Sequence, residues 1–443
     1  MWHETMYDVL NIINNIILMC IGIPFFLQLI YMLLFWVKKK TFKKSDIKGK
    51  VAIVYAARNE EDVIYETIKQ MRDNQDYPKE LYDIYVICHN CTDNTKAEAE
   101  RAGAKTIVYN DPDPKTHIKA YCMNYGIDYL LKQGIEYDFV LCFDADNRCN
   151  KEYISLMNDA YQSGVKFARP YESASNMTQN CFTKACGLYY IFDSRFSSRV
   201  RERLHIGAHV NGSGMMIAYS VLKERGGFNC FSISEDAEFT LDLMDKKIFA
   251  HFVEDAVVYE DLPSTFKDTY NRNKRIGSGS IRLIFGKMGK LFLKFFYTFK
   301  FSYLEYFLTY FFNIICVLLC TWIPLFYIYD IVYLLLVTNN VIQVTANTVA
   351  SYSQVLTNTW IVIVVCVSVL FVFCGFLQAF LLIMLDYKKM GAKKRSELIS
   401  GMFLFPFFSV IYIITLALGV FSKPSWNKIK RNPKNKSINK STQ

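Results

Sequence analysis

The sequence has 443 residues, of which 52% are hydrophobic and 16% aromatic, and it carries a formal net charge of +10. This apolar content excludes a disordered chain, and the length fits two or three units of ordinary domain size. No zinc-finger spacing or helix-turn-helix pattern supports nucleic-acid binding, so contact with anionic lipid headgroups explains the positive charge better.

Long uncharged stretches indicate an integral membrane protein. They cover residues 9–37, 306–329, 331–385 and 398–422, and a helix needs about 20 apolar residues to cross a bilayer. We expect 9–37 to be a retained anchor, because it is longer than the apolar core of a signal peptide and no basic region precedes it. The polar insert 38–300 has room for one large soluble domain.

Basic residues predict the orientation of these segments. Seven lysines lie between Lys38 and Lys50, and further basic residues lie between Lys388 and Arg395 and within 423–440. Positive charge stays on the cytoplasmic side of a membrane. We therefore expect a multi-pass protein of the cell membrane with the insert in the cytoplasm.

The number of crossings after the insert is left open. Three apolar segments follow it, at about 303–336, 359–385 and 399–421, and three crossings would place the basic tail outside. Either one segment is re-entrant, for which Pro406 favours 399–421, or 303–336 breaks near Pro324 into two short helices.

The insert alternates short apolar runs with helical patterns. The expected strands are 51–57, 82–88, 105–109 and 137–143, and the expected helices are a segment ending near residue 72, 94–102 and 117–132. This alternation predicts a parallel sheet with helices on both faces. Ligands bind at the carboxyl ends of such strands, where polar clusters lie at 58–62, 89–93 and 144–146.

Asp144 and Asp146 form the sharpest motif. Two carboxylates at positions i and i+2 of an extended segment point the same way, and at a strand end they can hold Mg²⁺ or Mn²⁺. A solvated acidic turn is the alternative. We favour the metal site because the motif follows the fourth strand of the series.

A second acidic cluster covers residues 234–238. Asp236 could act as a general base on an acceptor hydroxyl, or Ser234 and the acids could simply begin a helix; both can hold together. The segment Gly212–Gly214 allows a tight backbone beside a substrate or forms a plain loop.

Residues 281–300 carry five basic residues and no acid. They suit an amphipathic helix on the inner membrane surface, with a helix buried against the soluble domain as the alternative. The pair Cys88 and Cys91 lacks a second pair of ligands at a suitable spacing, so we do not expect zinc there.

In this order, the motifs resemble those of membrane-embedded family 2 glycosyltransferases, the group that holds the cellulose, hyaluronan and poly-N-acetylglucosamine synthases. The resemblance covers about residues 51–280 and rests on five motifs at family-like spacing. It implies an α/β GT-A fold, a Rossmann-like nucleotide-sugar-binding domain in the cytoplasm, inserted between transmembrane helices.

The resemblance also implies residues that bind the donor. Ala57, Asn59 and Glu60 lie in what looks like the first nucleotide loop. Asp93 looks like the acidic residue that ends the second loop. Lys119 looks like the lysine that contacts the donor nucleotide.

The remaining motifs imply the catalytic centre. Asp144 and Asp146 look like the Asp-x-Asp pair that binds nucleotide and metal, and 212–214 looks like the acceptor-side glycine loop. Glu235 and Asp236 look like the Glu-Asp motif, with Asp236 as the catalytic base.

Two positions depart from the family pattern. His89 stands where the second loop usually carries an aspartate that reads the base. The Gln-x-x-Arg-Trp motif reads Arg272-x-x-Arg275-Ile276, in which Arg275 could still contact a diphosphate. Ile276 replaces the tryptophan that ordinarily forms part of the acceptor platform, and this replacement speaks against long-chain processivity.

The resemblance implies inverting transfer of a sugar from a nucleotide sugar to a growing polysaccharide or a lipid-linked glycan at the inner membrane face, and the expected donor is a UDP-sugar. The expected cofactor is Mg²⁺ or Mn²⁺, and the expected partners are the donor, the glycan or lipid-linked acceptor and membrane lipids, without nucleic acid. The alternative is a catalytically weak or non-catalytic partner subunit of a polysaccharide synthase.

The expected organisation has five parts. They are a transmembrane helix at 9–37, a GT-A domain at 48–280, an amphipathic interface helix at 281–300, a transmembrane region at 301–422 and a basic disordered tail at 423–443.

Overall fold

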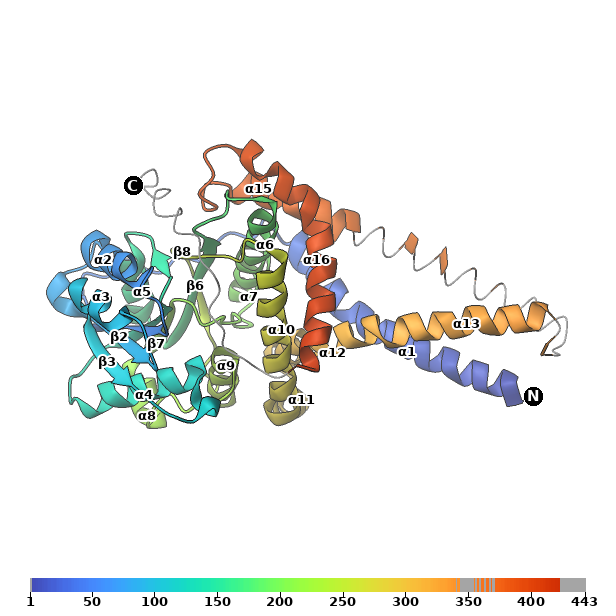
Figure 1. Cartoon of the computed structure of the whole chain (residues 1–443), viewed down its shortest axis with the longest axis horizontal. Coiled ribbons are helices and arrows are strands. Elements are labelled where there is room, and N and C mark those ends of the chain that lie inside the picture. The colour runs from blue at the N-terminus through green and yellow to red at the C-terminus, as the bar shows by residue number, and fades with distance from the viewer. Residues whose placement is uncertain are drawn as a thin grey trace.

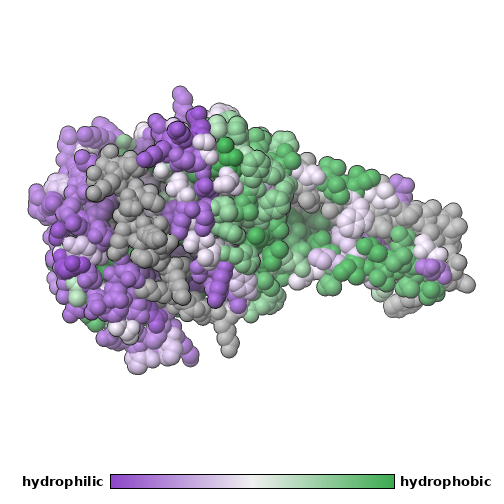
Figure 2. Space-filling model, turned by 45° about the horizontal axis from the view of Figure 1, so that its top comes forward, coloured by the Kyte–Doolittle hydropathy of each residue, from purple (hydrophilic) through white to green (hydrophobic). Residues whose placement is uncertain are grey.

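The protein divides into an αβ body and a set of apolar helices that extend from one side of it (Figure 1). The computed structural model describes residues 2–339, 341–342, 354, 357, 360–361, 364–365, 368 and 371–422. The expected tail at 423–443 lies outside the described residues, as does much of the first half of the expected segment 359–385. Hydrophilic side chains cover the αβ body and hydrophobic ones the helices beyond it (Figure 2).

Eight strands form one sheet in the order β3-β2-β1-β4-β7-β6-β8-β5. Their bounds are Val51–Ala57 (β1), Tyr82–His89 (β2), Lys105–Tyr109 (β3), Phe139–Asp144 (β4), Arg148–Cys149 (β5), Phe167–Ala174 (β6), Met215–Ala218 (β7) and His251–Glu260 (β8). The first four match the expected strands closely, and β1 and β3 match them at both ends.

One half of the sheet is parallel and the other is mixed. Strand β1 pairs in parallel with β2 and β4, and β2 with β3, as expected. Strand β7 instead runs antiparallel to both β4 and β6, and β5 antiparallel to β8. The predicted parallel arrangement is therefore confirmed for β1 to β4. The other half, where the pattern predicted no strands, is mixed because the chain leaves the sheet at the end of β6 and re-enters it at that same end in β7.

Both faces of the sheet are covered, which explains the continuous apolar run of β1. Val51, Ile53 and Tyr55 face one hydrophobic core, and Ala52 and Val54 face the other. A strand buried on both faces has no polar side and therefore loses the alternating pattern.

The helices of the αβ body connect these strands. They are Ile64–Asn74 (α2), Thr95–Arg101 (α3), Lys119–Lys132 (α4), Tyr153–Gln162 (α5), Cys181–Phe192 (α6), Arg199–Arg203 (α7), Tyr219–Arg225 (α8) and Glu235–Asp245 (α9). A π-helical turn at Asp193–Ser198 joins α6 to α7.

Within the part of the chain that the structure describes, three segments are long and apolar enough to cross a membrane: Asp8–Leu33, Phe301–Thr338 and Arg395–Val420. They contain the helices Trp2–Leu33 (α1), Phe301–Cys320 (α12), Trp322–Thr338 (α13) and Ile399–Val420 (α16). A shorter apolar helix, Gln378–Asp386 (α15), follows a π-helical turn at Val372–Leu377.

The structure distinguishes the two proposed helix breaks. The helical stretch from 301 to 338 is interrupted at Thr321, three residues before Pro324, as one alternative expected. Helix α16 runs unbroken through Pro406, so a break there is wrong. Pro406 packs against Gly375, and apolar helices tolerate proline where their neighbours compensate.

Helix Phe266–Leu283 (α10) continues through a π-helical turn into Gly289–Thr298 (α11). The expected boundary at residue 280 thus falls inside one helical run. On α11, Leu291 is buried and Phe292 packs on Phe307 of α12, with ring centroids 4.6 Å apart, whereas Tyr297 is 84% exposed. The segment therefore has one face on α12 and one open face, which accommodates both interpretations of 281–300.

Helices α10 and α16 touch through their backbones. A Cβ added at Gly277 would collide with the carbonyl oxygen of Leu416, and one at Gly419 with the carbonyl oxygen of Lys274. The two glycines therefore let an apolar helix lie directly against the αβ body, as Figure 1 shows for α10 and α16.

We expect Gly277→Ala to lower the unfolding temperature of the full chain in detergent. Alanine usually stabilises a helix by about 1 kcal/mol relative to glycine, but here overpacking costs about 1–3 kcal/mol. Gly289→Ala is the matched control, because a Cβ there meets no described atom within 4 Å. An unchanged or higher unfolding temperature in Gly277→Ala would contradict this close packing.

Candidate active site

Lys119 is the centre of a partly buried ionic cluster at the carboxyl end of β4, in which Glu235 is buried and Asp144 is partly exposed. As the first residue of α4, it places Nζ 2.6 Å from Oδ1 of Asp144 and 3.4 Å from Oε1 of Glu235. Burial alone would lower the pKa of Lys119, but these two carboxylates raise it above its ordinary value. Lys119 is therefore a fixed positive charge beside the strand end.

Glu235 and Asp236 are the first two residues of α9, where helix N–H groups have no intrahelical partner. The backbone N–H of Ala237 donates to Oδ1 of Asp236 at 2.7 Å. Burial raises the pKa of Glu235 to about 7 despite the charge of Lys119, and it also raises the pKa of Asp236. The acids therefore begin a helix, as one interpretation expected, and they also lie beside Lys119; the role of Asp236 as general base stays a prediction.

The glycine loop closes over these acids. Gly212 has φ +82°, and a Cβ there would lie 3.0 Å from Oδ2 of Asp236 and 3.4 Å from Nζ of Lys119. The hydroxyl of Ser213 donates to Glu260 and lies 3.4 Å from Oδ2 of Asp144. Only a glycine lets the backbone come this close at this angle.

Asp144 and Asp146 fit a divalent cation in their chemistry. Their turn is held by Asn147, whose Oδ1 accepts from the N–H of Asp144 at 2.9 Å and whose Nδ2 lies 3.4 Å from Asp146. Among the described residues no group of three or more His, Cys, Asp or Glu side chains could hold a metal. A cation here would complete its shell with diphosphate and water oxygens, as Mg²⁺ commonly does.

Hydrogen bonds join the two loops that are predicted to bind the donor. Oδ1 of Asn59 accepts from the N–H of Thr92 at 2.8 Å, and the N–H of Glu60 donates to Thr95 at 2.8 Å. Asp93 accepts from Thr95 at 3.0 Å and from Glu61 at 3.2 Å. These side chains shape the loops, and their contact with a donor remains a prediction.

Ala57 and His89 lie at the ends of β1 and β2. The carbonyl of Ala57 accepts from Sγ of Cys91 at 3.6 Å. His89 is fully buried, with its ring 4.8 Å from that of Tyr109, and burial together with the charge of Arg58 lowers the pKa of His89 to about 4. Such a burial does not support a direct contact between His89 and a donor base.

The structure brings Arg272, rather than Arg275, into contact with the site. Nη2 of Arg272 donates to Glu260 at 3.0 Å, and its guanidinium lies over the ring of Tyr190 at 4.9 Å. Among the described residues no hydrogen bond joins Arg275 to the Lys119 cluster. Sequence reasoning missed Arg272 and Glu260; the first stands in the altered motif, and the second ends a strand that the pattern did not predict.

Comparisons with known proteins identify the family of the chain. The profile of "Glycosyl transferase family group 2" matches residues 139–387, and that of "Glycosyl transferase family 2" matches residues 52–224. The first match covers more than half of the chain, so the chain belongs to this glycosyltransferase family. It is a transferase with a GT-A fold.

Curated relatives are distant and longer than the matched region. "Probable glycosyltransferase YdaM" of Bacillus subtilis is 25% identical over 254 residues, which are 55% of this chain and 58% of that protein. "Beta-monoglucosyldiacylglycerol synthase" of Nostoc sp. is 26% identical over 249 residues, 54% of this chain and 52% of that protein. The chain thus spans less than two thirds of the length of either relative.

A similar solved structure is "Mannosyltransferase PcManGT from Pyrobaculum calidifontis in complex with GDP-Man and Mn2+". It is 13% identical, with a TM-score of 0.45, and the match covers 63% of this chain and 75% of that one.

We expect Gly212→Ala to slow sugar transfer by about 10- to 100-fold, because its Cβ would displace Asp236 or the loop by a fraction of an ångström to about 1 Å. Gly226→Ala is the control. Gly226 has a similar φ of +69°, but a Cβ there meets no described atom within 4 Å. We expect this control to lose about 1 kcal/mol of stability and to keep its rate of nucleotide release. A wild-type rate in Gly212→Ala would show that the close approach is not needed.

Proposed function

We propose that this member of the glycosyltransferase family transfers a sugar, with inversion, from a nucleotide sugar to a lipid-linked glycan or a growing polysaccharide. The observation that carries the proposal is the Lys119 cluster: a partly buried lysine, the Asp144 strand end and the Glu235-Asp236 pair meet beneath a glycine loop. We further propose a UDP-sugar as donor and Mg²⁺ or Mn²⁺ as cofactor.

In the proposed reaction Asp236 takes the proton of an acceptor hydroxyl. The acceptor oxygen then forms a bond to the anomeric carbon of the donor from the face opposite the diphosphate. The bond between that carbon and the diphosphate oxygen breaks, and the nucleoside diphosphate leaves with the electron pair. This single displacement inverts the configuration of the sugar.

The neighbouring residues prepare both ends of this displacement. Lys119 presents a positive charge where the diphosphate would develop negative charge. A cation held by Asp144 and Asp146 would add to this stabilisation. Burial of Glu235 and Asp236 raises the pKa of both carboxyls toward neutrality, which suits a general base that works near pH 7.

The apolar helices near the altered Arg272 motif, where we place the acceptor, support a lipid-linked acceptor. Tyr190 of α6 and Arg272 of α10 lie there, and α16 packs directly behind α10. Apolar helices thus stand beside the residues that would face an acceptor. Relatives from Nostoc sp. and Synechocystis sp. are named beta-monoglucosyldiacylglycerol synthases, which supports a lipid acceptor for this chain as well.

Basic residues support a cytoplasmic site at a membrane surface. After α1, Lys39 pairs with Asp255 at 2.7 Å and Lys40 with Glu202 at 2.7 Å. After α15, Lys389 lies 3.3 Å from Glu254. Both basic segments therefore lie on the αβ body, as the positive-inside rule requires if that body is cytoplasmic.

We expect Asp236→Asn to abolish sugar transfer while UDP still binds, because the amide cannot accept the acceptor proton. The assay is UDP release by the detergent-solubilised full chain, with a panel of UDP-sugars, manganese or magnesium and added membrane lipids as acceptors. Asp242→Asn is the control, since Asp242 lies on the same helix but pairs with Arg225 and Lys287.

Full activity in Asp236→Asn would remove Asp236 as the base. Release from the wild type that continues unchanged in EDTA would remove the role of the metal. The absence of release with any donor would favour a non-catalytic partner or a donor other than a uridine nucleotide.

We expect kcat/KM to fall at acidic pH, and to do so at a higher pH than an ordinary aspartate would give, because the pKa of Asp236 is raised and a protonated Asp236 cannot act as the base. In Glu235→Gln one negative charge beside Asp236 is gone, while Lys119 and Asp144 remain. The pKa of Asp236 should then decrease, and the acidic limb of the pH profile of kcat/KM should shift to lower pH by about one unit. An acidic limb that stays in place would contradict the coupling.

A further inference from the structure

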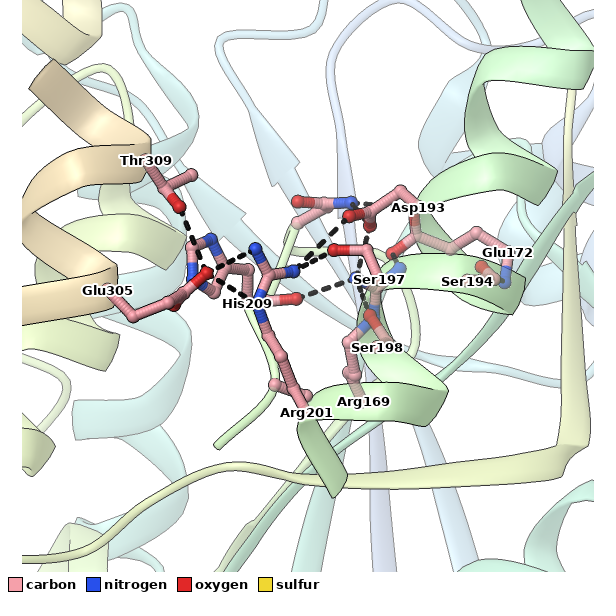
Figure 3. A network of polar contacts seen from close by, with 12 residues as sticks. Arg169, Glu172, Asp193, Ser194, Ser197, Ser198, Arg201, His209, Glu305 and Thr309 are labelled. Carbon is pink, nitrogen blue, oxygen red and sulfur yellow. Dashed lines mark hydrogen bonds and ion pairs between the residues drawn. The ribbon is translucent and has the colours of Figure 1, made fainter. Parts of the chain in front are cut away.

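One buried polar network connects the apolar helix α12 to the glycine loop (Figure 3). It contains two arginines, three acids, a histidine and small hydroxyl residues, and its labelled members are Arg169, Glu172, Asp193, Ser194, Ser197, Ser198, Arg201, His209, Glu305 and Thr309. The acids and arginines come from β6, the π-helical turn, α7 and α12. The network thus spans the junction between the αβ body and the apolar helices.

Glu305 is the charged residue of α12, and it is fully buried. Oε1 accepts from Nη2 of Arg201 at 2.6 Å and from Thr309 at 3.2 Å. Oε2 lies 3.0 Å from Nε2 of His209. A buried carboxylate persists only with such partners, and an ionisable residue in an apolar helix is a candidate for a functional role.

His209 transmits this contact to the backbone of the 208–214 loop. Its ring lies 4.0 Å from that of Tyr306 and parallel to that of Tyr310 at 6.0 Å, so α12 holds it on two sides. Burial and the charge of Arg201 lower the pKa of His209, against the influence of Glu305. The backbone carbonyl of His209 accepts from Nη1 of Arg169 at 2.7 Å.

The next residues of the loop reach the proposed catalytic groups. Nδ2 of Asn211 donates to Glu172 at 2.9 Å and to Asp193 at 3.3 Å. Gly212 follows, within reach of Asp236 and Lys119. Between His209 and Gly212 there are only two residues, so a displaced histidine must shift the backbone beside the base.

We propose that Glu305 is a positioning residue for sugar transfer: through His209 it sets the 208–214 loop and thereby the place of Gly212 against Asp236 and Lys119. This inference rests on the proposed function, because it takes Asp236 as the base. If Glu305 positions the 208–214 loop in this way, the active site is complete only when α12 is packed on the αβ body.

The test compares Glu305→Gln, His209→Gln and the double variant in the full chain, purified in detergent. Rates are expressed per UDP-binding site, so that misfolded molecules do not count. We expect Glu305→Gln to lower kcat by about 10- to 100-fold, as a misplacement near 1 Å does, with donor KM and UDP affinity within about threefold. Because Glu305 acts through His209, the double variant should be no slower than the slower single variant.

Asp330→Asn is the matched control. Asp330 is also a buried acid of the apolar helices, but it lies on α13. We expect its kcat per binding site to stay within about twofold of wild type. An equal loss in this control, a near-normal kcat in Glu305→Gln, or losses that multiply in the double variant would each overturn the proposal.

A second measurement is independent of activity. Hydrogen exchange should become faster at the amides of residues 208–214 in Glu305→Gln and stay unchanged in β1 and β2. If wild type releases no UDP, the proposed function fails, yet this exchange experiment still tests the link between Glu305 and the loop. If Glu305→Gln does not fold, His209→Gln tests the same contact from the loop side, and unchanged exchange in 208–214 would overturn the proposal.

Discussion

The carboxylate of Glu305 is buried between an apolar helix and the αβ body, where an unpaired charge would cost several kcal/mol. Arg201 neutralises it, and the guanidinium of Arg201 also lies over the ring of Tyr31 in α1, 5.2 Å from its centroid. One arginine of the αβ body therefore contacts both α12 and α1. This one side chain therefore links both α12 and α1 to the αβ body.

A second buried carboxylate repeats the arrangement on the other side of the junction. Glu254 of β8 accepts from Nε of Arg199 at 2.6 Å and lies 3.3 Å from Nζ of Lys389. The hydroxyl of Tyr171 in β6 donates to Asp386 at the end of α15, at 2.9 Å. Strand β6 takes part in both junctions, through Arg169 in the first and Tyr171 in the second, and β8 takes part in the second. These strands belong to the half of the sheet that supplies Glu260 and the 208–214 loop.

This division also explains what the sequence could predict. Strands β1 to β4 are joined by local crossovers, so the alternation of apolar runs and helical patterns was enough to find them. The acids at 144 and 146 stood out by their spacing at a strand end, whereas the role predicted for Asp236 came from the family resemblance. Strands β6 to β8 depend on contacts between distant segments. The pair Arg201–Glu305 is 104 residues apart, and no local pattern marks it.

The same limit applies to single residues. The altered motif drew attention to Arg275, but the helix turns Arg272 toward Glu260, and only the packing of α10 decides between them. The break near Pro324 was predictable because proline disturbs the helix ladder. The continuity of α16 through Pro406 was not predictable, because no local pattern shows that Gly375, distant in the sequence, leaves room for the proline ring.

Charge balance at the site gives a reason for its composition. Lys119 is surrounded by the acids Asp144, Glu235 and Asp236. Asp146 follows Asp144 by two residues in the sequence, so the acidic side chains outnumber the single positive charge of Lys119. A diphosphate would be repelled by that excess. A cation at the Asp144 and Asp146 carboxylates would reverse the repulsion, and a proton on Glu235, whose pKa burial raises to about 7, would reduce it further. The acids can therefore lie this close together because a cation and a proton can offset their charge, while Gly212 leaves space beside Asp236, the proposed base.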